Sequence, residues 1–205
     1  MLHRDVNALG ASDKIHRAAH SFKHFAGDGP VGEVASLVDL QRAENGKVDK
    51  ESLAVRGWQR AGALAHFFSS QKKLRPDVIF ASMEGVGSKS FRPQETVTPL
   101  AELLGLTRRN GLVYKHLKEE FGPLIDDVMT RKGKVLVAWE HTFIPKLVGL
   151  LPDAPEVPQK WPSKRFDVVW VLDRKKHGWK FKQVPQLVLA GDSHMPIPFK
   201  SDRKH

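Results

Sequence analysis

Short apolar runs alternate with segments of helical periodicity along much of this chain, and this alternation limits the folds that it can adopt. The run at 134–141, KVLVAWEH, is apolar almost throughout, as strands inside parallel sheets are. Apolar runs at 33–41 and 77–82 are also predicted strands. Because strands separated by helices form mostly parallel sheets covered on both faces, we expect an α/β fold, a three-layer α/β/α sandwich.

Helices are predicted between these strands by apolar spacing and by boundary residues, at 57–68, 93–105, 119–133 and 143–151. Pro99 lies inside the second of them and predicts a kink or a later start. Two late apolar runs surround the turn KKHG and indicate a hairpin, which we expect to add antiparallel edge strands to the sheet.

The chain divides by composition into three parts. A breaker cluster, GDGP, closes an N-terminal arm at 1–30, a single domain is expected over 31–192, and a basic tail over 193–205. The arm carries His16, His20 and His24 at a spacing that would align them on one helical face, as metal ligands are aligned. No cysteine or group of acids completes a metal site there, so we interpret them as a solvated face.

Composition excludes several classes of function. The 205 residues include no cysteine, which excludes disulfides, thiolate catalysis and cysteine-ligated zinc and favours a cytoplasmic location. No apolar run approaches the roughly 20 residues of a membrane helix, and no secretory signal is expected. The net charge of +10 attracts anions, but Lys and Arg are scattered, which argues against a dedicated nucleic-acid binder.

Candidate site residues follow the predicted strands, where open α/β sheets bind their ligands. Gln41, Arg42 and Glu44 follow the first strand, Arg92 ends the loop after the second, and His141 ends the third. Arginine and histidine side chains at a basic strand end suit a phosphoryl group, because a guanidinium matches phosphate oxygens in a bidentate way.

These segments resemble the histidine phosphatase (phosphoglycerate mutase-like) superfamily. The stretch LAVRGWQRAGALA at 53–65 is similar to that family's second element, and IFASMEGVGSKSFRPQETVTPLAELLGL keeps Arg92, Gln94 and Thr96 in the family's order. KVLVAWEHTFI sets His141 in the place of the family's second histidine. The resemblance covers about residues 33–192 and implies a phosphate site made of Gln41, Arg42, Arg92 and His141, with catalytic roles for His141 and Glu44.

The chain departs from the family at its nucleophile. Aligned without gaps, Arg42 stands where the family has the histidine that attacks phosphorus, and Glu44 keeps the acidic place. Arginine has no free lone pair at neutral pH, since its pKa lies above about 12, so it cannot replace that histidine. A one-residue gap would align Arg42 with the family's arginine instead, and the histidine would still be missing. Glu84 is a second, weaker acidic candidate.

The sequence therefore predicts a catalytically impaired phosphatase-like protein that binds phosphate or a small phosphorylated molecule and needs no cofactor or metal. Two alternatives stay open. One is an active phosphomonoesterase that uses His141 or a direct attack by water. The other is an interaction module that uses the basic surface. The ligand, the substrate and the oligomeric state are not defined by the sequence.

Overall fold

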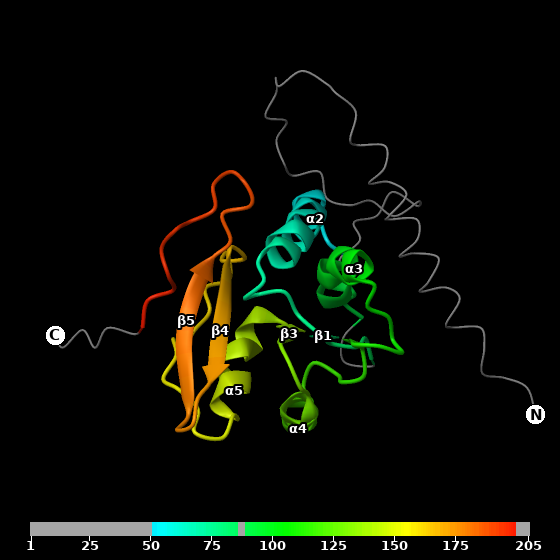
Figure 1. The fold of residues 1–205 in the computed structure, drawn as a ribbon. Helices are drawn as coiled ribbons and strands as arrows, with labels where there is room; N and C mark the ends of the chain where they lie inside the picture. Colours follow the sequence, from blue (N-terminus) through cyan, green and yellow to red (C-terminus); the bar gives the residue numbers. More distant parts are fainter. Residues whose placement is uncertain (1–50, 86–88, 200–205) are drawn as a thin grey trace, which may run out of the picture. The chain divides into compact units, whose positions relative to one another are not determined.

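The computed structural model describes residues 51–85 and 89–199, and its elements are a small parallel sheet, an antiparallel strand pair and helices (Figure 1). The parallel sheet has the order β2-β1-β3, in which β1 is Val78–Ala81, β2 is Leu112–Val113 and β3 is Val135–Ala138. The antiparallel pair consists of β4, Val168–Arg174, and β5, Trp179–Pro185. A mixed α/β fold is thus confirmed for the described residues.

The helices of this region are α2 (Val55–Ser70), α3 (Arg92–Leu104), α4 (Phe121–Thr130) and α5 (Ile144–Gly149), with a short 3-10 turn, η1, at His141–Phe143. Each predicted helix is present. The apolar spacing on α2 predicts an inner face of five residues, of which Trp58 is partly exposed and four are buried: Ala61, Leu64, Ala65 and Phe68. Pro99 does not break α3. The helix loses one backbone N–H there, while burial of its neighbour Leu100 against the sheet offsets that loss.

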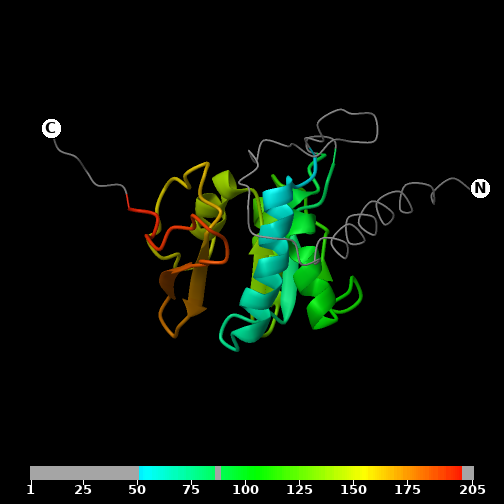
Figure 2. The same ribbon diagram turned by 90° about the horizontal axis from the view of Figure 1, so that it is seen from above.

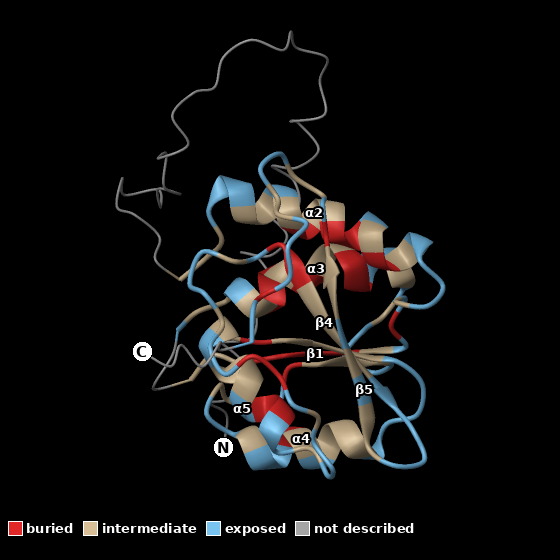
Figure 3. Cartoon of the chain, turned by 90° about the vertical axis from the view of Figure 1, so that its left-hand side faces the viewer, coloured by how far each residue is buried: buried red, intermediate tan, exposed pale blue. Residues whose placement is uncertain are grey.

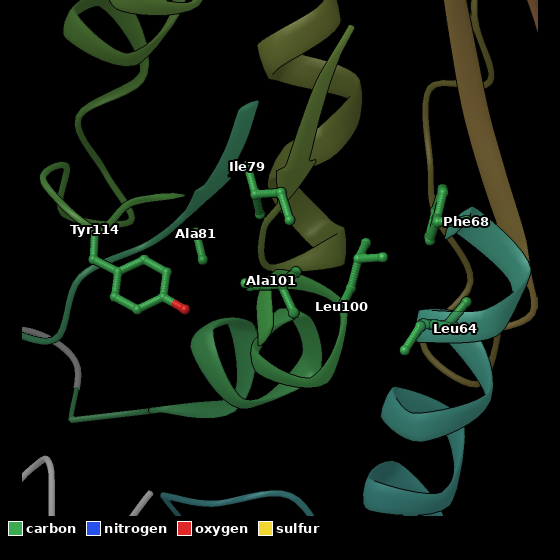
Figure 4. Close-up of a cluster of buried hydrophobic side chains, with 9 residues drawn as sticks. Leu64, Phe68, Ile79, Ala81, Leu100, Ala101 and Tyr114 are labelled. Atoms are coloured by element: carbon green, nitrogen blue, oxygen red, sulfur yellow. The ribbon is translucent and has the colours of Figure 1, made fainter. Parts of the chain in front are cut away.

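Alternating side chains of the parallel sheet separate two apolar clusters. On β1, Ile79 and Ala81 join a cluster with α2 and α3, which Figure 4 shows around Leu100. Phe80 points the other way and packs with Leu124 of α4. Figure 3 shows the same arrangement, with the buried surfaces of α2 and α3 on one side of β1 and those of α4 and α5 on the other. The alternation of β1 side chains therefore positions helices on both faces of the sheet.

The late strands form the predicted antiparallel pair, but in the described residues this pair is not joined to the parallel sheet. β4 and β5 form a hairpin closed by a bond from the Lys175 N–H to the Gly178 carbonyl. Within the described residues this pair is a separate two-stranded sheet rather than an edge of the parallel sheet. Figure 2 shows it beside α2, and Val169 of β4 packs against the cluster under that helix. The run at 33–41, predicted as the first strand, lies outside the described residues.

Residues after β5 are bound to the domain by buried polar contacts. The Arg60 guanidinium on α2 donates to the Asp192 carboxylate at 2.5 and 3.1 Å, and that carboxylate also accepts the N–H groups of Val188 and Leu189. Residues 193–197, which fall in the predicted basic tail, continue these contacts: the Ile197 N–H donates to the Gln183 side chain at 2.8 Å, and Ile197 is buried.

We predict that the Asp192 carboxylate stabilises this fold at neutral pH and makes that part of its stability sensitive to acid. The Arg60 hydrogen bond lowers the pKa of Asp192 from 3.8 to about 2, so the stabilisation is complete above about pH 4 and is lost as the pH falls towards 2. Asp192→Asn should lower the free energy of unfolding by roughly 2 kcal/mol at neutral pH and flatten its decline in acid. Denaturant titrations at several pH values test this, with the exposed Glu156→Gln as control. An unchanged acid profile in Asp192→Asn would contradict it.

Candidate functional site

The ends of two neighbouring strands bring two of the predicted site segments to one edge of the sheet. β1 and β3 are parallel and in register, so that Ala81, the last residue of one, is paired with Ala138, the last residue of the other. The loop that leads to Arg92 and the short segment that leads to His141 therefore leave from adjacent points at the carboxyl edge.

The loop after β1 is held by Gln94 of α3. The Gln94 side chain is 2% exposed, and its Nε2 donates to the Ser82 carbonyl at 3.2 Å and to the Glu84 carboxylate at 2.5 Å. The Met83 N–H donates to the His116 carbonyl at 2.7 Å, which extends the pairing of the β1 and β2 chains past the strand ends. Gln94 thus holds Glu84 in place and fixes the first residues of this loop.

Arg92 is the first residue of α3 and is exposed. Its Nε donates to the Ser52 carbonyl at 3.1 Å, and Thr96 Oγ1 donates to the Arg92 carbonyl at 2.7 Å. Next to this contact, the Leu53 N–H donates to the Glu95 carboxylate at 2.6 Å. The segment before α2 therefore crosses the start of α3 and holds the guanidinium of Arg92 through its Nε.

His141 begins η1, three residues after the end of β3. The turn is anchored by Trp139, which is buried and whose indole N–H donates to the Lys118 carbonyl at 2.9 Å. The partly buried His141 ring meets the Phe166 ring edge to face, with centroids 5.8 Å apart. Glu140, which lies between Trp139 and His141 in the sequence, has its carboxylate 3.6 Å from the Lys118 ammonium. The backbone that carries His141 is thus held on both sides.

These contacts hold Arg92 and His141 in segments that leave from neighbouring strand ends, and no side-chain hydrogen bond joins these two described residues. Thr96, matched to the family in the sequence, has a structural role, because its hydroxyl caps a carbonyl of its own helix. The remaining predicted site residues, together with the three histidines of the arm, lie outside the described residues: Gln41, Arg42, Glu44, His16, His20 and His24.

A second polar cluster, which the sequence did not predict, lies between the loop after β2 and α4. His116 is 5% exposed, and its Nε2 lies 3.0 Å from Asp127 Oδ2, while Arg131 contacts the other carboxylate oxygen at 2.6 Å. Although burial opposes it, hydrogen bonds from His116, Arg131 and Lys115 lower the pKa of Asp127. A hollow of about 510 Å³ lies alongside.

This His116–Asp127 cluster has a structural explanation. The His116 ring stacks on Phe80 of β1 with centroids 6.3 Å apart, and its bond to Asp127 ties the loop to α4. In residues 51–85 and 89–199, no group of three or more His, Cys, Asp or Glu side chains is arranged to hold a metal ion. His116 lies in a loop eleven residues before Asp127, and the apolar spacing of the predicted helix that carries Asp127 does not relate it to that loop, so the sequence carried no signal of the pair.

Comparison with protein-family models and with curated proteins returned no match for this chain. None of the helices in the described part of the chain has both the length and the apolar character needed to cross a membrane.

We predict that Gln94 and Glu84 act as a coupled pair. Gln94→Leu leaves a buried carbonyl and a carboxylate without their donor, so it should lower the free energy of unfolding by about 1–3 kcal/mol. Glu84→Gln should lower it less, and the double variant should cost less than the sum of the two. Gln71→Leu, which removes a similar but exposed bond to a carbonyl, should change it by less than about 0.5 kcal/mol. Strict additivity of the two changes, measured by denaturant unfolding, would contradict this pairing.

Proposed function

We propose that this chain is a histidine phosphatase-like protein that has lost its nucleophile and binds phosphate or a small phosphorylated molecule at the carboxyl edge of its parallel sheet. The observation that carries the proposal is the in-register pairing of β1 and β3, whose ends lead to Arg92 and His141. A cytoplasmic location, which the absence of cysteine favours, is part of the proposal.

The chemistry of these two side chains suits a phosphate. A guanidinium donates parallel hydrogen bonds to two phosphate oxygens, and an imidazole adds a donor from a second direction. Both residues stand on anchored backbone: Arg92 at the start of α3 beside Ser52, and His141 after the buried Trp139. Fixed donors lose less conformational freedom when an anion binds, which favours binding even without a reaction.

Loss of catalysis is proposed from the sequence. Arg42 stands in the place of the nucleophilic histidine and cannot form a bond to phosphorus, since it keeps its proton at neutral pH. Removing a covalent nucleophile commonly costs several orders of magnitude in rate and leaves substrate binding largely in place. A cation at position 42 would still attract an anion. We therefore expect binding to be retained and turnover to be lost.

We also propose the finer fold, a three-layer α/β/α sandwich built on this parallel sheet. In the described residues β3 is paired on one side only, to β1, and its apolar side chains are partly exposed. A larger sheet would pair the other side of β3 and cover these side chains.

Titration with inorganic phosphate, followed by calorimetry or by backbone amide NMR, tests the site. Arg92→Ala should weaken phosphate binding by about tenfold or more, since it removes a charge-assisted contact, and His141→Ala should weaken it by a smaller factor. Two matched controls remove a like side chain elsewhere: Arg109→Ala, in the exposed turn before β2, and His177→Ala, in the β4–β5 turn. Both should bind phosphate as the unaltered protein does. Equal weakening in the controls would mean that the overall positive charge, rather than a site, attracts the anion.

A further inference from the structure

Phe166 is exposed directly beside His141. Phe166 directly precedes the buried Asp167 in the sequence, and Phe166 itself is 56% exposed. Its ring stands at 77° to the His141 ring, with centroids 5.8 Å apart. A single exposed apolar side chain is common on a protein surface, but this one touches the imidazole proposed to bind phosphate, so a ligand held there would meet its ring.

The backbone around Phe166 is fixed, so its exposure is not the result of a loose loop end. The Arg165 guanidinium donates to the Asp167 carboxylate at 2.7 Å and to the Met195 carbonyl at 2.7 Å. The second oxygen of Asp167 accepts the Ser193 N–H at 2.7 Å, and the Asp167 carbonyl accepts the Gln186 N–H at 2.8 Å. Both neighbours of Phe166 are therefore tied to other parts of the chain.

The two segments that are hydrogen-bonded to the neighbours of Phe166 each carry another exposed apolar side chain. Met195, whose carbonyl accepts the bond from Arg165, is 57% exposed. Leu187 follows the Gln186 contact and is 59% exposed, and its backbone takes a φ of 51°, a strained value for a residue with a branched side chain. Strain of this kind persists where the surroundings fix the backbone, and it is often found at functional sites.

We propose that Phe166 is the apolar wall of the phosphate site and that the ligand is a phosphate ester whose organic part is aromatic or apolar. This inference rests on the proposed function, because His141 is the group that relates Phe166 to the phosphate. An aromatic ring attached to the phosphoryl group would lie against Phe166 while His141 and Arg92 hold the oxygens, as stacked or edge-to-face rings do in proteins. A sugar phosphate, with hydroxyl groups on every side, would gain little from such a wall.

Three probes separate the two proposals: inorganic phosphate, glycerol 1-phosphate and phenyl phosphate. Phenyl phosphate should bind the full chain about three- to tenfold more tightly than glycerol 1-phosphate, the range expected for one aromatic contact. Phe166→Ala should reduce that ratio towards one and leave the affinity for inorganic phosphate unchanged. Phe166→Trp, which keeps an aromatic face, should preserve the preference.

Leu103→Ala is the matched control. Leu103 is 59% exposed and lies on α3, eleven residues and therefore about 16 Å along the helix from Arg92. The Leu103→Ala variant should bind inorganic phosphate, glycerol 1-phosphate and phenyl phosphate with unchanged affinities. If inorganic phosphate fails to bind the unaltered protein, the proposed function is wrong. If phosphate binds but Phe166→Ala keeps the preference for phenyl phosphate, only the apolar wall is wrong. A large loss of thermal stability in Phe166→Ala with an unchanged ratio would also overturn it, because the ring would then serve the chain's own packing.

Discussion

The parallel pairing of β1 with β3 determines where the helices that cover the sheet and the loops that follow these strands begin. Alternate side chains of β1 enter two different apolar clusters, so the strand needs helices on both of its faces. Because the two strands end in register, the loops that follow them must begin next to each other. Connections from parallel strands return over the faces of the sheet, which keeps the carboxyl edge open to a ligand. The fold of the core thus gives neighbouring starting points to the segments that lead to Arg92 and His141, which are about fifty residues apart in the sequence.

Several contacts anchor the backbone at the carboxyl edge of the parallel sheet. Gln94 fixes the first residues of the loop after β1, the segment before α2 fixes the start of α3, and Trp139 fixes the turn that carries His141. Such supporting contacts allow charged donors to keep one geometry, and they are what a binding site needs whether or not it is catalytic. A protein that has lost a nucleophile can therefore keep its affinity for phosphate as long as this support is intact.

Periodicity in the sequence predicted the helices and the longer strands because their apolar faces are repeated several times. On α2, for example, four of the five residues that the spacing predicts to face inward are buried, and the fifth, Trp58, is partly exposed. β2 was not predicted, since Leu112 and Val113 alone carry no period. The His116–Asp127 pair was also missed, because contacts between a loop and a helix depend on tertiary packing that no local pattern records. Arg92 and His141 were placed correctly after their strands, whereas the exposure of Phe166 beside His141 emerges only from the packing of β4.

The account depends on one anion being held by both Arg92 and His141. Crystals of the full chain soaked in tungstate, a heavy mimic of phosphate, give an anomalous signal that locates the anion directly. We expect a single strong peak at the carboxyl edge of the parallel sheet, within hydrogen-bonding distance of the Arg92 guanidinium and the His141 imidazole, and with one tungstate oxygen directed away from both. A peak bound by other basic residues, with none at this edge, would contradict the account.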